Sequence, residues 1–247
     1  MDMKRFKILT LSLLLFSLVV NQAAAAQAVG NTTAAATTIS PAAQTLSKAG
    51  NGVLDFNEVI HLVFLREAEK LERDVFTILS SMYPDSQLFG RIDDIEQGHA
   101  DVMKYLLKQY GVKDPNVNDN LGVFTGELYG NFFSSTYRYL VGLGSLSELD
   151  AFYVSAYIEE TNLLDIMQCP DAIVSQDNGI DDVSQCGMGY THNVEIINVY
   201  HALIEGSKSD LRAYVQAIES VIGEGAYKAQ AMSQQQLDEI LGRDAHQ

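Results

Sequence analysis

Residues 66–75 read REAEKLERDV, and seven of these ten residues are charged. They lie within a longer segment, residues 55–82, whose apolar residues recur at three- and four-residue steps: Ile60, Phe64, Leu71, Val75 and Ile78. This period is typical of an amphipathic α-helix, and Pro84 ends it. A helix of this kind buries its apolar stripe against other helices, so the segment predicts a helical core.

The charged residues of this helix divide between two faces. Positions 60, 64, 67, 71, 74 and 78 share the apolar stripe, so Glu67 and Asp74 interrupt a surface that is otherwise suited to a core. Glu69 and Glu72 fall away from that stripe, and we expect them to face water. A buried carboxylate is costly unless it is paired, protonated or bound to a metal, which makes Glu67 a candidate ligand.

Further helical periods follow along the chain. We expect long helices over residues 91–110, 145–167 and 193–222, with Ser145 as the N-cap of the second, and short helices over residues 132–141 and 233–241. Residues 112–131 are rich in Asn and Gly and predict a loop. No segment shows persuasive strand-like alternation. The predicted fold class is therefore all-α, a four-helix bundle with short accessory helices.

Polar residues also interrupt the stripes of the other long helices. Glu96 and His99 share one face at the i, i+3 spacing, which lets a carboxylate oxygen and an imidazole nitrogen bind one ion. Glu159 and Asp210 take corresponding positions on the later helices. Taken singly, each residue is better explained as part of a solvated face, and only the joint pattern makes a metal site an equal alternative.

Several stretches resemble a known family. They are REAEKLERDV at 66–75, IEQGH at 95–99, IEE at 158–160, GSKSDLRAY at 206–214 and YKAQ at 227–230, which is followed by Ser233. In order and spacing they are similar to the ferritin-like domain of unknown function 2202, over about residues 54–241. The resemblance implies a ferritin-like four-helix bundle of the carboxylate-bridged di-metal type. It implies that Glu67, Glu96, His99 and Glu159 are metal ligands.

The sequence departs from that family at two positions. The family usually has an acidic residue where this chain has Asn162, and a histidine where it has Asp210. With Asp210 as a fifth candidate ligand, the site would hold one imidazole and several carboxylates. Oxygen-rich ligation favours harder ions, iron or manganese, over zinc. Whether the second metal position survives these departures is left open.

Composition excludes other classes of protein. The chain has 247 residues, with 32 acidic and 16 basic side chains and a net charge of −16. A strongly acidic chain repels phosphate backbones, which argues against a nucleic-acid partner. At 47% hydrophobic residues it is too apolar to be disordered throughout.

The N-terminal residues predict export. A basic start, an apolar run over residues 8–20 and a group of alanines indicate a signal peptide over residues 1–26, cleaved near Ala26. An uncleaved anchor is the alternative. Residues 27–50 then form an Ala/Thr-rich lead-in, and residues 51–247 form the helical domain. The mature protein is expected to be secreted or periplasmic, with no stable membrane anchor.

The two cysteines, Cys169 and Cys186, bracket the segment between the third and fourth long helices. In an oxidising compartment we favour a disulfide between them over two free thiols. The bond would close one loop and could not staple the fold as a whole.

Two functions from different classes remain. In the first, the bundle binds one or two iron or manganese ions and reacts with O₂ or peroxide, as a di-metal oxidoreductase would. In the second, it is a metal-free helical binding or structural module, with the carboxylates satisfied by neighbouring side chains. The metal, the reaction, any redox partner and the oligomeric state are not readable from the sequence.

Overall fold

The computed structural model describes residues 53–243, except for the side chains of residues 90–95. The predicted signal peptide and lead-in lie outside these residues. The described region is all helical and contains no strand, which confirms the all-α prediction. Its elements are α2 (Phe56–Met82), α3 (Phe89–Gln109), α4 (Gly130–Gly144), α5 (Glu148–Met167), α6 (Asp171–Val174), the 3₁₀ turn η2 (Val183–Gln185), α7 (Val194–Ile222) and α8 (Gln234–Leu241). Within this region no helix is both long and apolar enough to cross a membrane.

Polar caps explain where several helices begin. Asp55 starts α2 with a capping box to Glu58, Asn193 caps α7, and Ser233 caps α8. The prediction that Ser145 caps the third long helix is wrong. Because α4 continues to Gly144, Ser145 closes that helix, and Ser147 caps α5 by accepting from the backbone N–H of Asp150.

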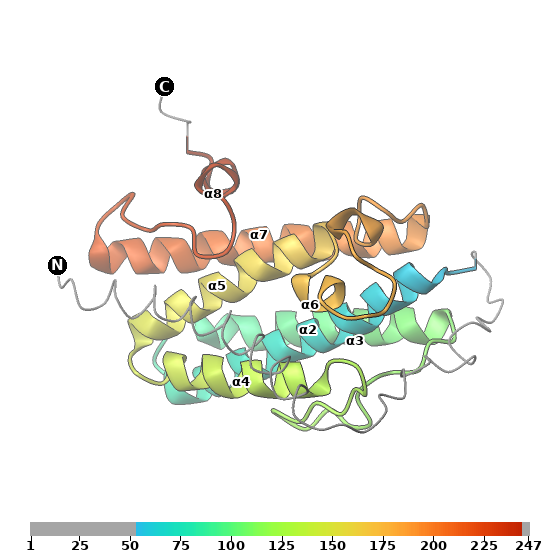
Figure 1. The fold of residues 1–247 in the computed structure, drawn as a ribbon. Coiled ribbons are helices and arrows are strands. Elements are labelled where there is room, and N and C mark those ends of the chain that lie inside the picture. The colour runs from blue at the N-terminus through green and yellow to red at the C-terminus, as the bar shows by residue number, and fades with distance from the viewer. Residues whose placement is uncertain (1–52, 244–247) are drawn as a thin grey trace, which may run out of the picture. The chain divides into compact units, whose positions relative to one another are not determined.

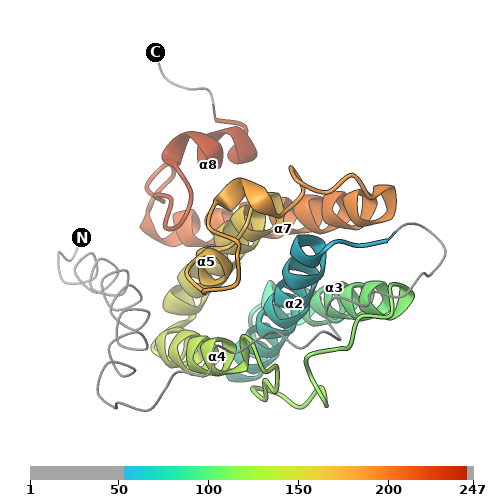
Figure 2. The same ribbon diagram turned by 45° about the vertical axis from the view of Figure 1, so that its right-hand side comes forward.

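The long helices form two antiparallel pairs, α2 with α3 and α5 with α7 (Figure 1). Between the pairs, the loop over residues 110–129 and helix α4 carry the chain back along the bundle. As a result α5 runs in the same direction as α3 (Figure 1). Helix α2 packs against α3, α4 and α5, and the second view shows it between α4 and α3 (Figure 2).

Helix α2 is buried on more than one side. All seven charged side chains of residues 66–75 are buried, including Glu69 and Glu72. The prediction that Glu69 and Glu72 face water is therefore wrong. A helical wheel assumes one buried face, whereas α2 has α3 and α5 on one side and the 110–129 loop on another.

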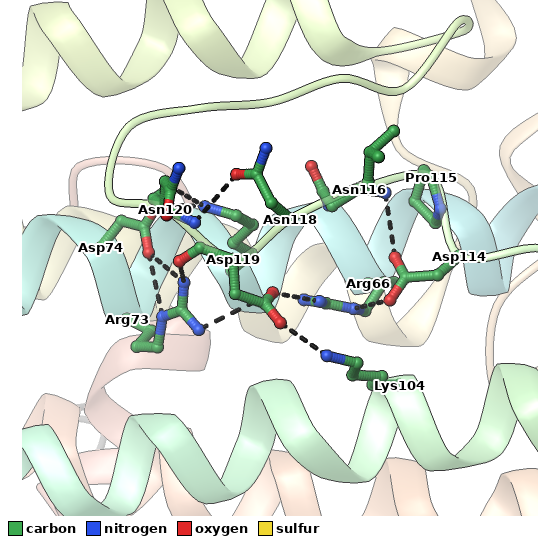
Figure 3. A network of polar contacts seen from close by, with 12 residues as sticks. Arg66, Arg73, Asp74, Lys104, Asp114, Pro115, Asn116, Asn118, Asp119 and Asn120 are labelled. Carbon is green, nitrogen blue, oxygen red and sulfur yellow. Dashed lines mark hydrogen bonds and ion pairs between the residues drawn. The ribbon is translucent and has the colours of Figure 1, made fainter.

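A network of ion pairs fastens that loop to α2 (Figure 3). Asp119 accepts from Arg66 of α2 at 2.6 Å and from Lys104 of α3 at 2.6 Å, so it joins both helices. Asp74 pairs with Lys70 and with Arg73, and it also accepts from the backbone N–H of Gly122 at 2.9 Å. The position of Asp74 within the apolar stripe is therefore explained by its contact with the loop. Its negative charge is compensated by Lys70 and Arg73.

Two further contacts hold α5 in place. Cys169 and Cys186 are joined in a buried disulfide that follows its C-terminus. On the helix itself, the carboxylate of Glu160 accepts hydrogen bonds from the Tyr227 hydroxyl and from three successive backbone N–H groups, those of Gln230, Ala231 and Met232. These hydrogen bonds hold residues 227–232, which include the YKAQ segment and lead into α8, against α5.

Candidate metal centre

Five side chains converge in the interior between the long helices. They form two groups whose candidate ligand atoms lie within 4.8 Å of one another: Glu69, Glu96 and His99 in the first, and Glu72, Glu96 and Glu159 in the second. Glu96 belongs to both groups. We call the five residues the carboxylate cluster. Helix α2 supplies two of them, α3 two and α5 one.

Each carboxylate of the cluster is almost completely buried. One oxygen of each has no hydrogen-bond partner among the described residues: Oε2 of Glu69 and Oε1 of Glu72, Glu96 and Glu159. A buried polar atom without a partner is costly, and a buried charge more so. Four such oxygens within one small region therefore suit a cation, which would satisfy them together.

The pKa values of these carboxyls follow from their surroundings. The pKa of Glu69 is raised to about 7, mainly by burial, with the charge of His99 lowering it and the nearby carboxylate of Glu96 raising it. Burial, followed by repulsion from neighbouring acids, also raises the pKa values of Glu72 and Glu159 well above the usual range. Their negative charges are thus poorly compensated by the protein alone.

His99 is the only cationic partner that these carboxylates have within the cluster. Its Nδ1 lies 3.2 Å from Oε2 of Glu96 and 3.9 Å from Oε2 of Glu69. Burial lowers the pKa of His99, but the hydrogen bond to Glu96 and the charges of Glu69 and Asp210 outweigh this and raise the pKa to about 9. Its side chain is 18% exposed, which makes it the most accessible member of the cluster.

Helix α7 passes close to the His99 ring because it has a glycine, Gly206, at this point. A Cβ atom at Gly206 would lie 2.7 Å from Cε1 and 2.8 Å from Nε2 of His99. The imidazole therefore occupies the volume that any other residue at position 206 would fill. Gly206 allows α7 to pass close to the ring while Nδ1 faces the carboxylates.

Three of the five predicted ligands, Glu96, His99 and Glu159, lie together in the cluster. Asp210 of α7 is buried and close enough to influence the pKa values of His99 and Glu159, but it belongs to neither group of ligand atoms. Glu67 points elsewhere. A Cβ at Gly126 would lie 2.5 Å from its Oε2, so its carboxylate packs against the loop that covers the other side of α2.

Sequence reasoning missed Glu69 and Glu72. Their i, i+3 spacing on α2 repeats the spacing of Glu96 and His99 on α3, and this repetition was the available signal. It was outweighed by the apolar stripe through Ile60, Phe64 and Leu71, which identifies one buried face and cannot reveal a second.

The fold and site together define an all-helical protein with a buried carboxylate cluster between its long helices. Residues 58–244 match the uncharacterized protein domain DUF2202, and the chain belongs to that family. It is 33% identical over 180 residues to the uncharacterized protein MJ0754 of Methanocaldococcus jannaschii, a match that covers 73% of this chain and 84% of the relative.

A solved structure supports the architecture. The crystal structure of the hypothetical protein MJ0754 from Methanococcus jannaschii DSM 2661 superposes with a TM-score of 0.62 at 31% sequence identity. The match covers 81% of this chain and all of that one. This chain is therefore similar to that protein in fold as well as in sequence.

Proposed function

We propose that this protein binds a pair of metal ions, iron or manganese, in the carboxylate cluster of a ferritin-like four-helix bundle. The observation that carries the proposal is the sharing of Glu96 by two groups of ligand atoms, each small enough for one ion. A carboxylate between two such groups can bridge two ions, and a two-metal site places them about 3.5–4 Å apart.

The connectivity supports a ferritin-like bundle. Ferritin-like folds join two antiparallel helix pairs by one long crossover. The loop over residues 110–129 with α4 provides such a crossover between the α2–α3 and α5–α7 pairs.

The ligand set differs from the usual di-metal pattern, in which two helices each supply a Glu and two others a Glu-x-x-His pair. Here α2 supplies Glu69 and Glu72, α3 supplies Glu96 and His99, and α5 supplies Glu159. With four carboxylates and one imidazole, the donors suit hard ions such as manganese and iron better than copper or zinc.

The protein's own groups would hold and shield the ions. The four carboxylates are buried, so they would hold the ions in a region from which bulk water is excluded. His99 lies at the more accessible side of this region. When bound, iron or manganese would supply redox chemistry with O₂ or peroxide. We therefore propose oxidoreductase or metal-handling activity as the function of the cluster.

A metal-free helical module is the competing function. It would require the buried acids to be satisfied by the protein, as Asp74 is by Lys70 and Arg73. The four carboxylate oxygens without partners argue against it. The two functions differ in a simple measurement: removal of metal by a chelator lowers the melting temperature if the site binds ions and leaves it unchanged if it does not.

Metal analysis of two matched variants tests the proposal. After loading with Mn²⁺ or Fe²⁺ and desalting, the protein is expected to retain about two ions per chain. Glu96→Gln should lose both, because it removes the shared ligand. Glu67→Gln is the control, since Glu67 is a buried glutamate on α2 outside the cluster. Retention of metal by Glu96→Gln at the level of the unaltered protein would contradict the proposal.

We also propose that the protein acts outside the cytoplasm. The basic and apolar character of residues 1–26 supports export, and the buried Cys169–Cys186 disulfide suits an oxidising compartment. N-terminal sequencing of the protein from its native source should find a chain that starts close after Ala26. A chain that still begins at Met1 and is recovered from the cytoplasm would contradict this.

A further inference from the structure

Asn162 of α5 touches both acids that α2 contributes to the carboxylate cluster. Its Nδ2 donates to Oε2 of Glu72 at 2.8 Å and to Oε1 of Glu69 at 3.2 Å, and it lies 3.4 Å from Oγ of Ser207. Asn162 is buried and lies three residues after Glu159, so both side chains project into the same interior. A single amide thus links the two groups of ligand atoms from the side of α5.

These hydrogen bonds divide the oxygens of each acid. Oε1 of Glu69 and Oε2 of Glu72 are bound to the amide, whereas Oε2 of Glu69 and Oε1 of Glu72 have no partner among the described residues. The free oxygen of Glu69 is the one that lies 3.9 Å from Nδ1 of His99. The amide therefore leaves one oxygen of each carboxylate for an ion, as hydrogen-bonded neighbours of metal ligands commonly do.

The neutrality of Asn162 matters as much as its hydrogen bonds. An aspartate of the same size at this position would add a negative charge next to Glu69, Glu72 and Glu159. In a buried site each such charge attracts a trivalent ion more strongly than a divalent one, because the interaction scales with the charge of the ion. A neutral amide reduces this advantage of the trivalent ion.

We propose that Asn162 is a positioning and specificity-determining residue of the cluster. It orients Glu69 and Glu72 with one oxygen each toward the ions, and its lack of charge shifts the preference of the site toward divalent ions, relative to an aspartate at the same position. This inference rests on the proposed metal binding and adds to it the charge of the ion that the site selects.

Competition between Mn²⁺ and Tb³⁺ measures this preference directly. The charges of Glu159 and Glu96 act on the buried phenol of Tyr214, whose pKa is raised by burial and then by these carboxylates, so we expect this phenol to sensitise the luminescence of Tb³⁺ in the cluster. The chain has no tryptophan, so tyrosines are its main sensitisers. The signal of Tb³⁺ bound to acids outside the cluster is measured with Glu96→Gln and subtracted. Displacement of Tb³⁺ by Mn²⁺ then gives the ratio of the Kd values for the two ions.

Asn162→Asp is expected to shift this ratio toward Tb³⁺ by about tenfold or more. Asn116→Asp is the matched control, because Asn116 is equally buried at 6% exposure but lies in the loop outside the cluster. It should leave the ratio unchanged. An unchanged ratio in Asn162→Asp, with both ions still bound, would overturn the role of Asn162 and leave the metal site intact. Failure of the unaltered protein to bind either ion at the cluster would overturn the metal site and this inference with it.

A second variant separates orientation from charge and covers the case in which Asn162→Asp does not fold. Asn162→Ala removes the donor without adding charge. It should weaken Mn²⁺ binding about tenfold, within the range known for such supporting residues, while the Mn²⁺-to-Tb³⁺ ratio stays near that of the unaltered protein. Unchanged Mn²⁺ affinity in a folded Asn162→Ala protein would contradict the orienting role.

Discussion

Nδ1 of His99 lies 3.2 Å from Oε2 of Glu96, one helical turn earlier on α3. Glu96 belongs to both groups of ligand atoms, and His99 is their only imidazole. The pair therefore connects the interior of the cluster with its more accessible side, where Gly206 of α7 passes the ring.

Gly206→Ala should disturb the cluster through His99. The added Cβ would lie 2.7 Å from Cε1 of the ring, so the imidazole must move away from its position. We expect Mn²⁺ affinity to fall about tenfold or more, as for loss of a well-oriented ligand. Gly142→Ala is the control, because a Cβ there meets nothing within 4 Å in helix α4. It should leave Mn²⁺ binding unchanged and raise stability by up to about 1 kcal/mol. Equal Mn²⁺ affinities in the two variants would show that His99 does not need this space.

Glu160→Ala should loosen the segment that leads to α8. The carboxylate accepts from three successive backbone N–H groups, which would be left without their acceptor. We expect a loss of about 3 kcal/mol in the free energy of unfolding, together with faster proteolysis within residues 223–243. Denaturant titration and limited proteolysis check the two effects. Tyr227→Phe, which removes one hydrogen bond to the same carboxylate, should cost only about 1 kcal/mol. Unaltered proteolysis in Glu160→Ala would contradict the anchoring role.

Asp74→Ala should destabilise the fold without removing any of the proposed metal ligands. The change leaves Lys70 and Arg73 buried without the carboxylate that compensates their positive charges. It also removes the acceptor of the Gly122 N–H. We expect a loss of about 3–5 kcal/mol, as for breaking a buried ion pair. At saturating Mn²⁺ the folded variant should still bind as many ions as the unaltered protein, because Asp74 lies outside the cluster. A lower stoichiometry in the folded protein would mean that Asp74 is a ligand.

His61 should contribute a dependence of stability on pH. Burial lowers its pKa from 6.5 to about 4, although its Nε2 lies 2.7 Å from the Asp165 carbonyl oxygen. Since the folded state disfavours the charged ring, the unfolded state binds the proton first as the pH falls. The contribution of His61 is complete above about pH 6.5 and is lost between that pH and about 4. The other titrating groups are shared by a His61→Gln variant, so the difference in stability between the two proteins isolates this effect.

That difference should shrink as the pH is lowered from 7 to 4, as measured by thermal unfolding at a series of pH values. A difference that stays constant or grows over this range would contradict the assignment. Because Nε2 of the neutral ring donates to the Asp165 carbonyl oxygen, Nδ1 of His61 accepts from the Tyr200 hydroxyl at 2.6 Å, and the variant is expected to be less stable at neutral pH.

Much of the fold follows from local sequence signals. The periods over residues 55–82 and 193–222 predict α2 and α7 almost to the residue, because Asp55 and Asn193 are strong N-caps. The predicted N-cap of α5, Ser145, lies two residues before the observed N-cap, Ser147. Both serines could cap the helix, and the length of α4, which continues to Gly144, decides between them. The small helix α6 has only four residues and lies within the loop closed by the disulfide, where no period can develop.

The candidate site was harder to predict for a physical reason. A helical wheel separates one buried face from one exposed face, and Glu96, His99 and Glu159 lie on the face that it assigns to the core in α3 and α5. Helix α2 does not, because the loop over residues 110–129 covers a side that would otherwise face water. The wheel therefore selected Glu67, which packs against that loop at Gly126, and discarded Glu69 and Glu72.

The most direct measurement is anomalous X-ray diffraction from a crystal of the protein loaded with Mn²⁺. Two manganese peaks are predicted on either side of the Glu96 carboxylate, about 3.5–4 Å apart, one beside Glu69 and His99 and the other beside Glu72 and Glu159. Absence of manganese from the cluster at full loading, or manganese bound at Glu67 instead, would contradict the central claim.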